Sequence, residues 1–250
     1  MPRKAGREAL MVAILCVVLH GCVVEDITGD ARIVIGCFGD SNTMTTGGSW
    51  CDKLSPLVSP YHWEVMNYGW PGATARNENP SGPAPCGGLL AFGAPKCSLW
   101  WLQSALTGFP PPLNVYLAPV DVVFLAYGTN DIYNGVSAYG DKALRVIPKL
   151  IVQAYSDDIA ALPAGTLVLV ALIPPFNPYA PSPPAAPWDP RWNRVVRATN
   201  HLIQQTWPAN RIVDFYAVAS VPEDYADLVH LNVGGQQKRA AAAYNALINS

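Results

Sequence analysis

A serine, an aspartate and a histidine stand in this chain where they could act together in covalent catalysis. Ser41 closely follows the apolar run ARIVIGCF of residues 31–38, in the stretch GCFGDSN. A serine hydroxyl is a weak nucleophile and needs a general base nearby. Among the histidines, His230 has the best-placed carboxylate, because Asp227 lies three residues earlier and can reach the imidazole across a turn. Such a carboxylate fixes the tautomer of the histidine and stabilises its protonated form.

Two further positions could stabilise the negative charge that develops on oxygen when a serine attacks a carbonyl group. Gly72 in NYGWPGAT can bring a backbone N–H close to a ligand, and Asn130 in YGTND offers an uncharged amide donor. With the backbone N–H of Ser41 they form a candidate oxyanion hole, in which loss of one donor typically lowers kcat by about 10²–10³-fold. Gly69, the other glycine of the same stretch, is the alternative to Gly72.

The elements that must position these residues indicate an α/β fold. Helical periodicity is expected over residues 141–160, 191–206 and 235–248, with a kink or restart at Pro148 in the first. Buried apolar strands that alternate with amphipathic helices predict a three-layer α/β/α domain with a mostly parallel central sheet of about five strands. Five runs are read as these strands: residues 31–38, 62–68, 120–127, 166–173 and, more weakly, 211–218.

This architecture predicts that the polar residues meet in space. Ser41, Gly72 and Asn130 each follow a predicted strand, and the carboxyl ends of parallel strands share one edge, where ligands bind. Residues 77–112 and 174–190 are rich in proline, leave the same edge, and are interpreted as loop insertions within one domain.

Aromatic residues in the two loops predict a neutral rim for the substrate. The rim carries few charges, which suits an uncharged ester of hydrophobic character or an acetylated sugar stacked on an aromatic ring. The tryptophans of the first loop could equally fill that loop's own small core. The candidate substrate-binding residues are Trp100, Trp101, Tyr179 and Trp188.

The same motifs resemble those of the SGNH, or GDSL, hydrolase family. FGDSN, NYGWPGA, YGTND and DLVH are similar to the blocks of that family, occur in its order, and extend from residue 38 to 230. The resemblance implies a flavodoxin-like fold and cleavage of esters or thioesters. It implies Ser41 as nucleophile with Asp227 and His230, and Gly72 and Asn130 as oxyanion donors. Asn42 follows the serine where leucine is common, a departure that weakens the resemblance little because it lies off the reacting groups.

The sequence therefore predicts a serine hydrolase that cleaves carboxylic esters through an acyl-enzyme, with no cofactor and no metal. Two alternatives stay open: a carbohydrate O-acetyl esterase, and a non-catalytic surface lipoprotein that binds glycan. The partner would be a small-molecule or glycan ester. The net charge of −2, without a basic cluster beyond the N-terminus, argues against a nucleic-acid partner. The oligomeric state is not predicted.

The first residues indicate export. A basic start is followed by ALMVAILCVVL, which is short for a membrane span but typical of a signal peptide, here over residues 1–21. Cys22 in LHGC resembles the lipidated cysteine of bacterial lipoproteins, which implies attachment to a membrane through an N-terminal lipid. Secretion to the periplasm or medium and an uncleaved anchor are the alternatives. Residues 22–250 then form a single hydrolase domain.

The remaining cysteines could form disulfides, because an even set in an exported chain favours pairing. Proximity favours Cys37–Cys51 and Cys86–Cys97, although Cys37 lies in an apolar strand and could be a free buried thiol. The cysteines show no CxxC spacing and no nearby histidine, so a zinc site is not predicted.

Overall fold

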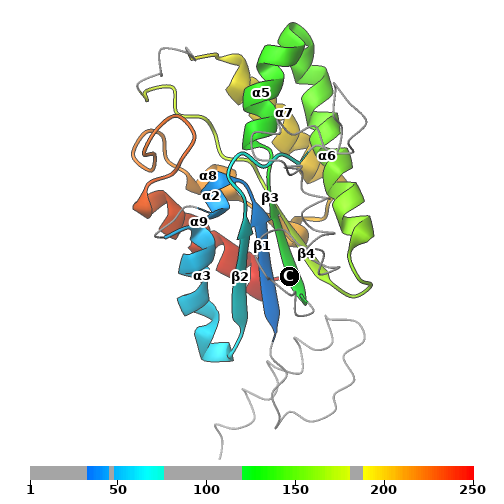
Figure 1. The fold of residues 1–250 in the computed structure, drawn as a ribbon, viewed down its shortest axis with the longest axis vertical. Coiled ribbons are helices and arrows are strands. Elements are labelled where there is room, and N and C mark those ends of the chain that lie inside the picture. Colours follow the sequence, from blue (N-terminus) through cyan, green and yellow to red (C-terminus); the bar gives the residue numbers. More distant parts are fainter. Residues whose placement is uncertain (1–32, 45–47, 76–119, 181–187) are drawn as a thin grey trace, which may run out of the picture.

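Five parallel strands form the middle layer of the molecule (Figure 1). The computed structural model describes residues 33–44, 48–75, 120–180 and 188–250. The sheet order is β2-β1-β3-β4-β5, and every neighbouring pair is parallel. This is the flavodoxin-like order, in which the chain changes direction between β1 and β3 and leaves a crevice at their carboxyl ends. The strands are β1 (Val34–Gly39), β2 (Glu64–Gly69), β3 (Val122–Ala126), β4 (Leu167–Ala171) and β5 (Ile212–Val213).

Helices cover both faces of this sheet because alternate strand residues point into two separate cores. Phe38 and Leu125 pack on one face beneath α5 (Thr129–Tyr139), α6 (Ala143–Ala161) and α7 (Arg191–Thr206). On the other face, Cys37 and Phe124 pack against α3 (Trp50–Val58) and α9 (Val233–Ile248). The predicted three-layer fold is therefore confirmed. The remaining described elements are α2 (Ser41–Met44), α8 (Phe215–Val218), η1 (Ser59–Tyr61), η2 (Gly140–Lys142) and η3 (Ala209–Arg211).

Two boundaries differ from the sequence prediction because a side chain begins a helix where the apolar pattern suggested otherwise. The strand expected over residues 211–218 is confined to β5, since the Asp214 carboxylate accepts the N–H of Ala217 and starts α8. The last helix begins at Val233 rather than 235, because the Asn232 side chain caps it at the N–H of Gly235.

Pro148 lies inside α6, and the helix continues through it without the predicted restart. A proline removes the hydrogen bond to the carbonyl four residues earlier, here that of Leu144. Leu144 is 46% exposed in the first turn, so water can solvate that carbonyl. Ala143 takes the buried position at the start of this helix, while Leu144 points outward.

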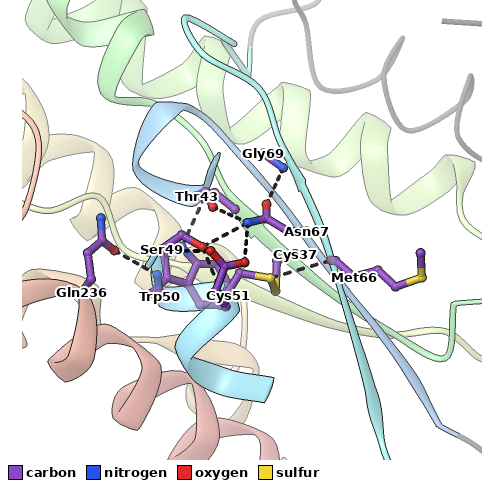
Figure 2. The surroundings of a disulfide bond; sticks show 10 residues. Cys37, Thr43, Ser49, Trp50, Cys51, Met66, Asn67, Gly69 and Gln236 are labelled. Carbon is purple, nitrogen blue, oxygen red and sulfur yellow. Dashed lines mark hydrogen bonds between the residues drawn. A yellow bond between two sulfur atoms is a disulfide. The ribbon is translucent and has the colours of Figure 1, made fainter. Parts of the chain in front are cut away.

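A disulfide joins β1 to α3 (Figure 2). Cys37 and Cys51 are fully buried, and their Cα atoms lie 6.1 Å apart. This is the first of the two pairings favoured by proximity. Nearby, the Asn67 amide of β2 donates to the carbonyl of Thr43 at 2.8 Å and to Ser49 Oγ at 3.0 Å. The disulfide and this amide together attach the segment that follows Ser41 to the sheet.

Replacing both Cys37 and Cys51 with alanine is expected to lower the free energy of unfolding by about 3 kcal/mol, the value for closing a loop of this size. Urea unfolding of the oxidised wild type and of the double variant measures the difference. Reductant should destabilise the wild type and leave the double variant unchanged. Equal unfolding midpoints for the reduced and oxidised wild type would show that the bond contributes nothing to stability.

Candidate active site

Ser41 opens the short helix α2 at the carboxyl end of β1 (Figure 1). The turn before it is tight: the Asp40 carbonyl accepts the N–H groups of Thr43 and Met44, and its carboxylate accepts that of Asn42 at 2.9 Å. A side chain at Gly39 would clash with the backbone of β3 and the side chain of Thr43, so only glycine permits this close return. The Gly-Asp-Ser sequence therefore turns the chain sharply and leaves the serine at the sheet edge.

The structure brings Ser41, His230 and Asp227 into one hydrogen-bonded series. Ser41 Oγ lies 2.9 Å from His230 Nε2, and His230 Nδ1 lies 2.7 Å from Asp227 Oδ2. The other carboxylate oxygen accepts the backbone N–H groups of Val229 at 2.8 Å and of His230 at 2.7 Å. The carboxylate thus favours the tautomer with its proton on Nδ1, which leaves Nε2 free to accept the serine proton.

The protonation of this pair follows from its contacts. Burial alone would raise the pKa of Asp227, but hydrogen bonds from the His230 ring and from the N–H groups of His230 and Val229 outweigh it and lower the pKa to about 2. The hydrogen bond to Asp227 raises the pKa of His230 above its ordinary 6.5, against the opposing effect of burial. Asp227 is therefore ionised at every pH where His230 can act as a base.

This coupling predicts the acid side of the pH–rate profile. His230 accepts a proton only when neutral, so kcat/KM should rise with pH through the raised pKa of His230, above 6.5. Asp227→Asn removes the largest cause of that rise, so the acid limb should move to lower pH while kcat falls by about 10³-fold or more. Rates of p-nitrophenyl acetate hydrolysis across pH measure both effects.

Glu223→Gln is the matched control, because its exposed side chain carries the same charge on the same loop. We expect Glu223→Gln to change neither the position of the acid limb of the pH–rate profile nor kcat. An acid limb that stays in place in Asp227→Asn would contradict the assignment of Asp227.

Two of the candidate oxyanion donors, Gly72 and Asn130, lie in the turn after β2 and in the first turn of α5, and hydrogen bonds join these two segments. Asn130, in the first turn of α5, donates from Nδ2 to the carbonyl of Ala73 at 3.0 Å. Asp131 accepts the N–H of Ala75 at 2.8 Å. Gly72 lies in the exposed turn after β2 with φ +73°. Gly69 is the weaker candidate, because it lies in β2 and its N–H already donates to the Asn67 side chain at 3.0 Å.

The GDSL-like lipase/acylhydrolase family model matches residues 37–238, which is most of the chain. This chain belongs to that family. The resemblance seen in the sequence motifs is thereby confirmed. No curated protein matches the chain.

Solved structures of GDSL-family and related enzymes share the fold of this family member. A lipolytic G-D-S-L protein from Veillonella parvula is 18% identical, with TM-score 0.56, covering 86% of this chain and 97% of that one. The aryl esterase of M. smegmatis is 21% identical, with TM-score 0.59 and coverages of 86% and 98%. Est24, a carbohydrate acetylesterase from Sinorhizobium meliloti, is 16% identical, with TM-score 0.60 and the same coverages.

In this GDSL-family chain, the segment that carries the predicted rim residue Tyr179 bonds to the turn of residues 227–230, called the histidine turn from here on. Tyr179 is 74% exposed, and its N–H donates to the Asn177 side chain. The backbone N–H of Asn177 donates in turn to the carbonyl of Leu228 at 2.9 Å. Trp188 differs, because it packs edge-on against Trp192 of α7 with ring centroids 5.6 Å apart. The described parts of the 174–190 segment contain no helix or strand.

Several predictions fall on residues outside the described ranges and stay predictions. They are the signal peptide of residues 1–21, Cys22, the insertion 77–112, the pair Cys86 and Cys97, and the rim residues Trp100 and Trp101. In the described ranges, no three His, Cys, Asp or Glu side chains are grouped so that they could hold a metal ion. No helix in the same ranges is both long and apolar enough to cross a bilayer.

Two buried polar residues near the candidate site, Asn42 and Arg239, were assigned no role from the sequence. Asn42 is 1% exposed and contacts the segment that carries His230. Arg239 of α9 is buried, stacks over the Phe215 ring at 5.0 Å, and shares a small cavity with Asp40. Burial lowers the pKa of Arg239 to about 10 and raises that of Asp40. Both residues lie in polar stretches of the sequence, GDSNT and QQKR, so their burial has no local signal.

Proposed function

We propose that this chain is a serine hydrolase that cleaves neutral carboxylic esters through an acyl-enzyme at Ser41. The observation that carries the proposal is the hydrogen bond between Ser41 Oγ and His230 Nε2, which joins residues 189 positions apart at the carboxyl edge of the sheet. A serine paired with an imidazole, which is itself oriented by a carboxylate, is the arrangement that activates a hydroxyl for attack on an ester. Membership of an acylhydrolase family supports the same chemistry.

In the proposed reaction, His230 takes the proton of Ser41 as Oγ attacks the ester carbonyl carbon. The resulting oxyanion accepts hydrogen bonds from the N–H groups of Ser41 and Gly72 and from the Asn130 amide. The C–O bond to the alcohol then breaks as His230 returns the proton to the leaving oxygen, which releases the alcohol and leaves the acyl group on Ser41. Water, deprotonated by His230, attacks this acyl group, and the proton returns to Ser41 as the acid leaves.

A carbohydrate O-acetyl esterase is the second candidate, and the exposed Tyr179 favours it, because it lies two residues after Asn177, whose backbone bonds to the histidine turn. An aromatic ring at a rim can stack on the apolar face of a sugar. One of the structurally similar proteins, Est24, is described as a carbohydrate acetylesterase. The two candidates share every catalytic step and differ only in the alcohol part of the substrate.

The test is a comparison of substrates with purified protein. We expect hydrolysis of p-nitrophenyl acetate, butyrate and octanoate, with kcat/KM values that report the acyl length accepted. Release of acetate from acetylated xylan at a higher kcat/KM, reduced by Tyr179→Ala, would favour the sugar esterase. Binding of the glycan without hydrolysis of any ester would replace the proposal with the non-catalytic binding protein.

A further inference from the structure

We infer that Asn42 is a positioning residue that holds the histidine turn over the nucleophile, an inference that rests on the proposed function. Asn42 directly follows Ser41 in α2. Its Nδ2 donates to the carbonyl of Val229 at 3.1 Å, and its Oδ1 accepts the N–H of Leu231 at 3.2 Å. These two residues flank His230 in the chain. The Asn42 carboxamide therefore bonds to the backbone on both sides of His230, the proposed general base, and lies next to the serine that this base must reach.

The turn needs such a support because its own hydrogen bonds are local. The Asp227 carboxylate bonds to the N–H groups of Val229 and His230 and to the His230 ring, which fixes the shape of the turn but not its distance from Ser41. The side chains of His230 and Asp227 are 39% and 52% exposed, so packing encloses neither of them. Asn177 supports the turn from the loop after β4. Asn42 supports it from the side of the nucleophile.

Asn42 can act as an anchor because its own position is fixed. Its N–H donates to the Asp40 carboxylate at 2.9 Å, and its carbonyl accepts Gln236 Nε2 at 3.1 Å. The other end of that amide, Gln236 Oε1, accepts the N–H of Trp50 at 3.1 Å, which connects the site to α3. A leucine at this position would have nearly the same size, but it offers neither the donor nor the acceptor that the turn requires. Asparagine at this position therefore makes two bonds to the histidine turn that leucine could not make.

Asn42→Leu tests the inference, because it removes both bonds while it preserves volume. Loss of the two Asn42 bonds leaves the substrate site intact but allows His230 to move away from Ser41. A misplacement of about 1 Å can lower the rate by about 10²-fold. We expect kcat for p-nitrophenyl acetate to fall by about 10–10²-fold with KM nearly unchanged. We also expect faster hydrogen exchange at the Leu231 amide, which loses its acceptor.

Asn200→Leu is the matched control. Asn200 is buried in α7, and its side chain also makes two bonds to the backbone, to the N–H and carbonyl of Ile173, both at 2.8 Å. We expect it to lower the melting temperature and to retain the wild-type kcat. Equal losses of kcat in the two variants, or a wild-type kcat in Asn42→Leu, would overturn the inference. If Asn42→Leu does not fold, Asn42→Ser, which cannot reach both partners, is measured in its place with the same expected results.

Hydrogen exchange separates failure of this inference from failure of the proposed function. If the wild type hydrolyses no ester, the proposed function is lost. The positioning role of Asn42 is still supported if the Leu231 amide is protected in the wild type and exchanges rapidly in the Asn42 variant. Rapid exchange of the Leu231 amide in the wild type would overturn the positioning role of Asn42, whatever the activity.

Discussion

Replacing Ser41 with alanine is expected to lower kcat for p-nitrophenyl acetate by about 10⁴-fold or more, because the proposed acyl-enzyme forms on the Ser41 hydroxyl. The variant should remain folded, since Ser41 lies only partly buried at the edge of the sheet and alanine is well tolerated in a helix. Initial rates and circular dichroism, measured on the same preparation, separate the two properties. Ser59→Ala, on the exposed end of α3, is the control and should retain full activity. Substantial hydrolysis by Ser41→Ala would place the nucleophile elsewhere.

Replacing His230 with alanine is expected to cause a loss of similar size, because the variant lacks the imidazole whose Nε2 lies 2.9 Å from Ser41 Oγ and which would accept its proton. The two losses should not add: Ser41→Ala/His230→Ala should be no slower than either single variant, as for residues that act as one unit. Steady-state kinetics of the three variants measure this.

His201→Ala is the control for the loss of an imidazole. His201 lies exposed on α7, where it contacts Gln205 at 3.0 Å, so its removal should leave kcat unchanged. A double variant much slower than both single variants would show that His230 acts independently of Ser41 and would contradict the triad.

The fold could be predicted because most strands are buried on both faces and read as continuous apolar runs. β1 and β3 show this most clearly, since nearly all of their residues are buried. β5 could not be delimited in the same way, because the apolar run continues past Val213 into α8, and only the capping contact of Asp214 marks the change. The start of α9 was predicted two residues too late, at residue 235, for a related reason. Glycine is typical of helix ends, but here Gly234 and Gly235 lie inside the helix that the Asn232 side chain caps.

In the candidate site too, residues could be assigned where the relevant pattern lies nearby in the sequence, and could not where it depends on distant residues. Asp227 and His230 could be paired from their spacing, because a turn of three residues brings them together wherever it lies. Ser41 could be placed because the end of a strand in a parallel sheet is a known position. Asn42 and Arg239 could not be assigned roles, since their partners come from remote parts of the chain, 187 positions away for Val229. Such contacts depend on the packing of the C-terminal part of the chain against α2, which no local pattern encodes.

The most direct test of this account is to locate the covalent adduct that a fluorophosphonate forms with the wild-type protein, by tandem mass spectrometry of its peptides. The probe reacts with a serine only when a base activates it. We predict a single modified residue, Ser41, with labelling abolished in His230→Ala. An adduct on any other residue, or an enzyme that hydrolyses esters but carries no label on Ser41, would contradict the assignment of Ser41 as the nucleophile.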